Sequence, residues 1–63
     1  MMNALKKATY EVTVGLQNKW NDPIRFVTFK YSNVDRYEAI SNAESDATVF
    51  PFINRWIANV ETI

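Results

Sequence analysis

Residues 8–17, Ala-Thr-Tyr-Glu-Val-Thr-Val-Gly-Leu-Gln, alternate between apolar and polar side chains. The apolar set is Tyr10, Val12, Val14 and Leu16. This alternation has the two-residue period of a β-strand with one buried face. The segment therefore predicts a strand, and the rest of the chain has to supply its neighbours in a sheet and a cover for its apolar face.

Residues 18–23, Asn-Lys-Trp-Asn-Asp-Pro, are a polar, turn-forming segment. Asn and Asp side chains bond their own backbone, and Pro23 fixes its φ angle, so we expect a hairpin loop here. Residues 24–31 are rich in β-branched and aromatic side chains and predict a second strand. Because both faces of that strand are partly apolar, we expect cover on both of them.

A helix is predicted over residues 34–46. Ser32 or Asn33 is the expected N-cap, with Asp35 in the first turn, where a negative charge meets the positive end of the helix dipole. Apolar residues recur at helical spacing: Val34, Tyr37, Ile40, Ala43 and Ala47.

The C-terminal segment has two interpretations. Residues 49–60 carry apolar side chains at helical spacing, whereas residues 56–63 alternate as a strand. We favour a third strand after a Phe50-Pro51-Phe52 connection, because a two-stranded hairpin alone is marginal in water; a second helix is the alternative. The expected fold is therefore α+β in the order ββαβ, a small antiparallel sheet with one helix across a face. It forms a single domain over residues 1–63, with residues 1–7 as a flexible tail or short helical turn.

The composition removes several classes of chemistry. The 63 residues include no His and no Cys, and Gly15 is the only glycine. Without an imidazole, Ser-His and Cys-His nucleophiles have no base, and one glycine does not make a phosphate-binding loop. We expect Gly15 to mark a bulge or a close backbone contact. The sequence predicts a protein that is not an enzyme, with no catalytic residues, no cofactor and no metal.

Size predicts self-association. A chain this short buries only about 60% of the surface that it exposes when unfolded, and it has no cysteine for disulfides. A partner subunit is the remaining way to add stability, so we expect a homodimer. No stretch resembles a secretory signal or a membrane span, which predicts a cytoplasmic protein that does not enter a membrane.

Nine aromatic side chains are many for so small an interior, so some are expected at the surface as a binding patch. The alternative to protein binding is single-stranded nucleic acid. Residues 25–30 match half of the RNP1 strand of an RRM domain, and a sheet face with Arg25, Phe29, Lys30 and Tyr31 would stack bases. Seven basic against seven acidic residues give no net charge, which disfavours a phosphate-backbone binder.

Two stretches carry a resemblance, residues 10–17 (Tyr-Glu-Val-Thr-Val-Gly-Leu-Gln) and residues 35–40 (Asp-Arg-Tyr-Glu-Ala-Ile). As a small, aromatic-rich chain of the ββαβ plan, the protein resembles phage-encoded accessory proteins that bind and disable host enzymes. The two stretches are similar to the small uracil-DNA glycosylase inhibitors of certain Bacillus phages. That resemblance implies a viral homodimer that acts as a DNA mimic, with Tyr37 in a pocket for a protruding leucine and Glu38 imitating a DNA phosphate. The neutral net charge departs from this pattern, because a DNA mimic is acidic.

The leading hypothesis is a non-enzymatic module that binds a host protein, with uracil-DNA glycosylase as the specific guess. Buried aromatic anchors would carry most of the affinity. The candidate partner-binding residues are Trp20, Asp35, Tyr37, Glu38 and Ile40.

Overall fold

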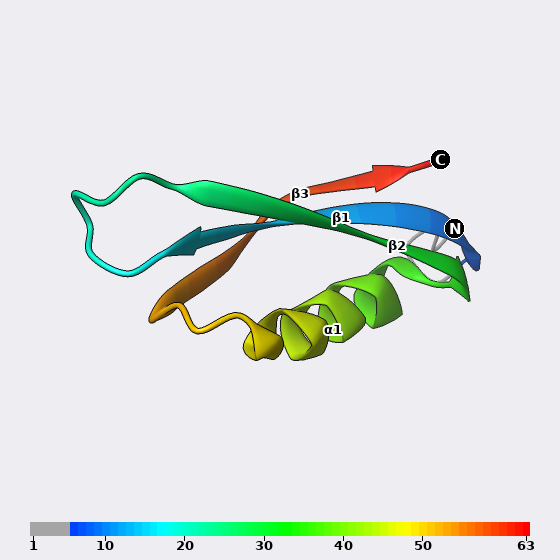
Figure 1. Cartoon of the computed structure of the whole chain (residues 1–63). Coiled ribbons are helices and arrows are strands. Elements are labelled where there is room, and N and C mark those ends of the chain that lie inside the picture. The colour runs from blue at the N-terminus through cyan, green and yellow to red at the C-terminus, as the bar shows by residue number, and fades with distance from the viewer. Residues whose placement is uncertain (1–5) are drawn as a thin grey trace.

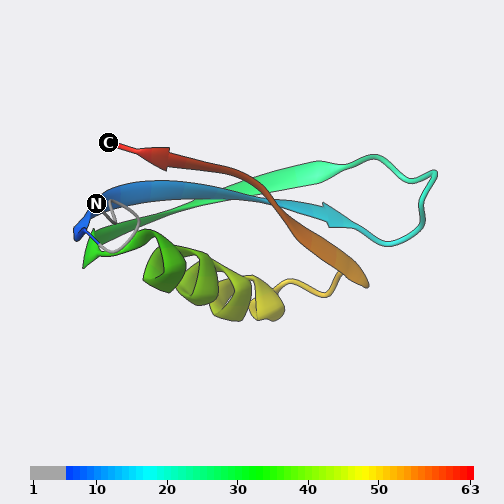
Figure 2. The same cartoon turned by 180° about the vertical axis from the view of Figure 1, so that it is seen from behind.

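A computed structural model describes residues 6–63 of the chain. Its elements are β1 (Ala8–Gln17), β2 (Arg25–Val34), α1 (Arg36–Asp46), the 3-10 turn η2 (Ala47–Val49) and β3 (Asn54–Thr62). The three strands form an antiparallel sheet in the order β2-β1-β3, and α1 lies across one face (Figures 1 and 2). The α+β fold in the order ββαβ is confirmed, and the last element is a strand rather than a second helix. The predicted N-terminal tail falls largely on residues 1–5, outside the described part.

The core lies between the central strand β1 and the helix. The four apolar side chains of β1 are all buried, and Val12 and Val14 are at most 1% exposed. Against them α1 and η2 place Ala39, Ala43 and Ala47, which recur every four residues and so form one ridge. An alanine ridge lets a helix approach a sheet closely, because no long side chain separates the two backbones.

The buried face of the helix differs from the predicted one. Ala43 and Ala47 are buried as expected, but Ala39 takes the place assigned to Tyr37, which is 60% exposed. Residues 37 and 39 are two apart and therefore lie on nearly opposite sides of a helix. The sequence pattern placed the large aromatic side chain on the inner face, whereas the structure buries the small Ala39 side chain completely between α1 and the sheet.

The helix also begins two positions later than predicted, at Arg36 instead of Val34. β2 continues through Val34, and Asp35 is the N-cap residue in place of Ser32 or Asn33. Its extended backbone and short carboxylate suit the cap position, where a side-chain oxygen accepts a hydrogen bond from an early helical N–H.

A β-bulge ends the pairing of β2. Ala8 pairs with Val34 whereas Tyr10 pairs with Tyr31, so β2 contains one residue more than β1 in this interval. Asn33 lies there with a φ of 59°, a left-handed conformation that Asn tolerates better than most residues. The extra residue brings Val34 against the core.

A second bulge changes the face assignment in β3. The extra residue is Ala58, opposite the middle of β1. On its two sides, Ile57 and Val60 both pack against the core although they are three residues apart. The simple alternation expected for this strand put Trp56 and Val60 on one face, and the bulge places Trp56 on the opposite face.

The sheet face away from α1 is uncovered within residues 6–63 (Figures 1 and 2). Val27, Phe29 and Tyr31 of β2 pack toward the helix, while Phe26 is 62% exposed on the other side. The expected cover on both faces of β2 is therefore absent from this part of the chain. The hairpin between β1 and β2 extends beyond the end of the helix (Figure 1). Over the described residues, no helix has the length and apolar character needed to cross a bilayer.

Candidate functional site

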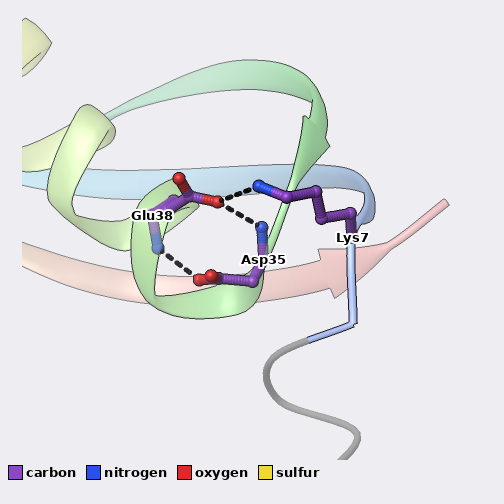
Figure 3. Close-up of polar contacts among 3 residues, drawn as sticks. All are labelled: Lys7, Asp35 and Glu38. Atoms are coloured by element: carbon purple, nitrogen blue, oxygen red, sulfur yellow. Dashed lines mark hydrogen bonds and ion pairs between the residues drawn. The ribbon is translucent and has the colours of Figure 1, made fainter.

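The start of α1 holds a polar cluster of three side chains (Figure 3). The Asp35 carboxylate accepts a hydrogen bond from the Glu38 backbone N–H at 2.8 Å, and the Glu38 carboxylate accepts one from the Asp35 N–H at 2.9 Å. These reciprocal bonds form a capping box. The same Glu38 oxygen also accepts from the Lys7 ammonium at 3.1 Å.

The hydrogen bonds in this cluster set the charge state of the Glu38 carboxylate and occupy one of its oxygens. The hydrogen bond from the Asp35 backbone N–H, followed by the one from Lys7, lowers the pKa of Glu38 below its ordinary value. The group is thus charged at neutral pH, but its charge faces the helix start and a lysine. Asp35 and Glu38 therefore have a structural role at the cap, which is a poorer arrangement for imitating a phosphate than a free carboxylate would be.

The predicted site residues lie at two ends of the molecule. Asp35 caps α1, and Tyr37, Glu38 and Ile40 lie in its first turns; Tyr37 is exposed and Ile40 half-buried. Trp20 lies in the hairpin loop at the other end of the sheet, and the longest dimension of the molecule is 41 Å (Figure 1). The structure thus gathers four of the five residues and leaves Trp20 apart from them.

The hairpin loop is closed by its own hydrogen bonds. The Gln17 side-chain amide donates to the carbonyls of Trp20 and Asp22, both at 2.8 Å. The Asp22 N–H donates to the Lys19 carbonyl at 2.9 Å, and the Asp22 carboxylate accepts from the Lys19 N–H at 3.2 Å. This bonded loop presents the Trp20 indole to solvent with 87% of its surface exposed.

Two isoleucines are exposed at the same end. The Ile53 N–H donates to the Asn18 side-chain oxygen at 3.1 Å, which ties the start of β3 to the hairpin. Ile53 is 79% exposed, and Ile24, directly before β2, is 48% exposed. We call Trp20, Ile24 and Ile53 the hairpin-end patch. Of these three residues, only Trp20 is among the candidates predicted from the sequence.

An aromatic row crosses the uncovered sheet face beside this patch. Gly15 of β1 pairs with Phe26 on one side and Trp56 on the other. A Cβ atom on Gly15 would lie only 2.3 Å from Cε2 of the Trp56 indole, so the ring occupies the space of the missing side chain. The close contact expected at Gly15 is present, and its partner is this side chain. A glycine inside a strand pattern is the signal that could have pointed to it.

The aromatic residues proposed to stack bases lie on the wrong face. Phe29 and Tyr31 are neighbours on the helix side, with ring centroids 6.3 Å apart. The Tyr31 hydroxyl donates to the Asp46 carboxylate at 2.5 Å, and burial together with this bond raises the pKa of Tyr31. Arg25 pairs with Leu16, whose side chain is in the core, and so also belongs to the helix side. Of the four residues, only Lys30 is on the uncovered face, where Phe26 and Trp56 are the aromatic side chains.

One hollow of about 240 Å³ lies between α1 and β3. Its lining includes Glu44, Thr48 and Arg55 together with apolar residues. The Arg55 guanidinium donates to the carbonyls of Phe52 at 2.6 Å and Phe50 at 3.4 Å, so it holds the connection to β3. Among residues 6–63 there is no group of three His, Cys, Asp or Glu side chains placed to hold a metal ion.

Comparisons with known proteins give no relative. A scan against protein-family models and searches of curated proteins and of solved structures found no match to this chain.

Proposed function

We propose that this chain is a non-enzymatic module that binds another protein through the hairpin-end patch. The observation that carries the proposal is the exposure of Trp20, Ile24 and Ile53 at one end of a small sheet, held there by backbone and side-chain hydrogen bonds. Several exposed apolar side chains gathered at one place on a small protein are characteristic of an interaction site.

The patch has the properties of a binding anchor. Tryptophan is among the residues that most often dominate the affinity of an interface, since a large rigid ring loses little conformational entropy when it is buried. The Gln17 amide fixes the loop backbone at Trp20 before any partner arrives, which lowers the entropy lost on binding. The hairpin loop that carries Trp20 also extends past the helix (Figure 2), so a partner can reach it without meeting α1.

The narrower form of the proposal is inhibition of a host enzyme, with uracil-DNA glycosylase as the specific target. It is supported by the resemblance in residues 10–17 and 35–40 and by the exposed Tyr37 on the helix. In this form the contact would include the helix start in addition to the hairpin end, so that Tyr37→Ser would weaken binding of the glycosylase, whereas in the general form it would not.

Paired variants test the two surfaces. The wild-type chain, the double variant Trp20→Ser/Ile53→Ser and the control Tyr37→Ser are immobilised and exposed to a bacterial lysate treated with nuclease. We expect the wild type and the control to retain the same protein in stoichiometric amount, and the double variant to lose it. Equal capture by all three chains would refute the hairpin-end patch as the binding site.

The enzyme target is tested separately with purified uracil-DNA glycosylase. Inhibition of uracil excision at near-stoichiometric ratios would support the narrower form. Unchanged excision at large excess would remove it and leave the general proposal to the capture experiment.

A second function, binding of single-stranded nucleic acid, is favoured by one observation. Phe26, Trp56 and Lys30 share the uncovered sheet face, and aromatic rings beside a cation can stack bases. Glu11 and Glu61 on the same face oppose it, because they repel phosphates. Labelled oligonucleotides whose mobility shifts in low salt, with affinity that falls as salt rises, would support this function.

A further inference from the structure

The uncovered sheet face is organised in rows that run across the strands. Residues paired across antiparallel strands project to the same side of the sheet. Each row takes one residue from β2, one from β1 and one from β3, in that order. The rows are Phe26, Gly15 and Trp56, then Thr28, Thr13 and Asn59, then Lys30, Glu11 and Glu61.

The two edges of this face complement each other. The β2 edge carries Phe26 and Lys30, and the β3 edge carries Trp56 and Glu61 at the corresponding positions. A two-fold axis parallel to β1 would exchange the β2 edge of one copy with the β3 edge of another while keeping the rows in order. Phe26 would then meet Trp56 of the second copy, and Lys30 would meet Glu61 of the second copy, each twice.

We propose that a second copy of this chain covers the sheet face opposite α1, in a symmetric sandwich whose two-fold axis runs along β1. The surface used is distinct from the hairpin-end patch, and the proposal does not depend on it. In this sandwich the second copy covers the face of β2 that residues 6–63 of the same chain leave uncovered. It also buries Phe26 and the exposed part of Trp56, 62% and 37% exposed in the single chain.

The middle row is compatible with close packing of two sheets. Its side chains are short and polar, and the hydroxyls of Thr13 and Thr28 already bond to each other at 3.1 Å. Face-to-face sheets lie about 10 Å apart with their strands within about 30° of each other. Small side chains in the centre permit this spacing, while the larger rings and charged groups lie at the two ends.

Other arrangements of two copies satisfy this face less well. A two-fold axis in the sheet plane but perpendicular to the strands would set the aromatic row against Lys30, Glu11 and Glu61, which would remove charges from water without partners. Pairing of two β3 edges would extend the sheet and leave the aromatic row exposed. Only the axis along β1 pairs both opposite charges and rings.

Glu11 is the unfavourable group in this arrangement. It lies in the middle of the charged row and therefore meets Glu11 of the second copy near the axis. The two charged rows together hold two lysines and four glutamates. Replacement of Glu11 by Gln should consequently tighten the dimer.

The charge pairing allows a test by exchange of charges. Lys30→Glu and Glu61→Lys are purified separately, and the mass of each species is measured by sedimentation over a range of concentrations. We expect a dimer for the wild type and a dissociation constant at least about tenfold weaker for each single variant, since each places like charges together twice. An equimolar mixture of the two variants should form a heterodimer, because both of its charge contacts are again opposite.

Lys19→Glu, in the hairpin loop, is the matched control and should dimerise as the wild type does. Circular dichroism checks that every variant is folded. A wild-type chain that stays monomeric, single variants that dimerise normally, or a mixture that gains no dimer would each overturn the proposal.

A cross-linking experiment tests the same interface if the charge-exchange variants fail to fold. Chains that carry Thr28→Cys and chains that carry Asn59→Cys are mixed and treated with a short thiol-reactive linker. The linker should join them, since in the sandwich Thr28 of one copy faces Asn59 of the other. Glu44→Cys, exposed on α1, should not be joined to either one. Linking that is no greater than that of Glu44→Cys would contradict the sandwich.

Discussion

Gly15→Ala tests the contact between the central strand and Trp56. The added Cβ would lie 2.3 Å from Cε2, 2.4 Å from Cζ2 and 2.7 Å from Nε1 of the indole. Carbon atoms in good contact are about 3.5–4.0 Å apart, so the ring must move by more than about 1 Å. The backbone of Gly15 has no positive φ and accepts an alanine without strain.

Two effects of opposite sign set the change in the free energy of unfolding for Gly15→Ala. Insertion of a carbon into a packed contact costs about 1–3 kcal/mol. Replacement of a glycine by alanine stabilises the folded state by about 0.4–1 kcal/mol, because the unfolded chain loses conformational freedom. We therefore expect Gly15→Ala to lower the free energy of unfolding by about 0.5–2 kcal/mol, as the difference of these two effects.

Removal of the indole should reverse the sign of the stability change that Gly15→Ala causes. In a Trp56→Ala background only the unfolded-chain effect remains, so the same substitution at Gly15 should stabilise the protein. Urea unfolding followed by far-ultraviolet circular dichroism measures all four chains of this double-mutant cycle, with protein concentration held constant because of the proposed dimer. An equal loss of stability with and without the indole would refute the contact as the reason for glycine at this position.

Three further predictions concern the helix. Asp35→Ala removes the N-cap and should lower the free energy of unfolding by about 1 kcal/mol in urea titrations; an unchanged midpoint would contradict the capping role. Because the pKa of Glu38 is lowered in the folded protein, the contribution of Glu38 to the free energy of unfolding is fully present above its ordinary pKa of 4.5 and is lost as pH falls through the folded-state value. Glu38→Gln should therefore flatten the acid limb of the profile of stability against pH; a limb as steep as that of the wild type would count against this. Ala43→Leu forces a long side chain between α1 and β1 and should cost about 1–3 kcal/mol, whereas Ser41→Leu on the exposed side should cost little; similar thermal midpoints for the two variants would disprove the close approach.

The local spacing of apolar residues was sufficient to predict the strands and the helix of this fold. β1 alternates cleanly because one of its faces is buried along its whole length, so its bounds and its inward side chains were predictable. The same holds for the hairpin and for the existence of α1. What periodicity cannot show is an extra residue in a strand, and the bulge at Ala58 therefore puts Trp56 and Val60 on opposite faces, although simple alternation groups them on one face.

The candidate site was less predictable, because it depends on distances between elements. Tyr37 had the right spacing for the core, but the alanine ridge brings the helix so close to β1 that only small side chains fit beneath it. Glu38 had the right chemistry for a phosphate mimic, and the structure ties it to Asp35 and Lys7.

The surface residues that now carry the proposals were hidden for a related reason. Ile24, Phe26 and Ile53 are apolar and fit the core by type alone. Ile24 and Ile53 lie just before β2 and β3, and within residues 6–63 no second layer covers the sheet face that carries Phe26.

Radical footprinting of the captured complex tests the proposed function most directly. Trp20 and Tyr37 are both exposed in the single chain and should be oxidised in its free form. If the partner binds the hairpin-end patch, oxidation of Trp20 and Ile53 falls when the complex forms while that of Tyr37 is unchanged. Protection of Tyr37 with continued oxidation of Trp20 would place the contact on the helix and contradict the account.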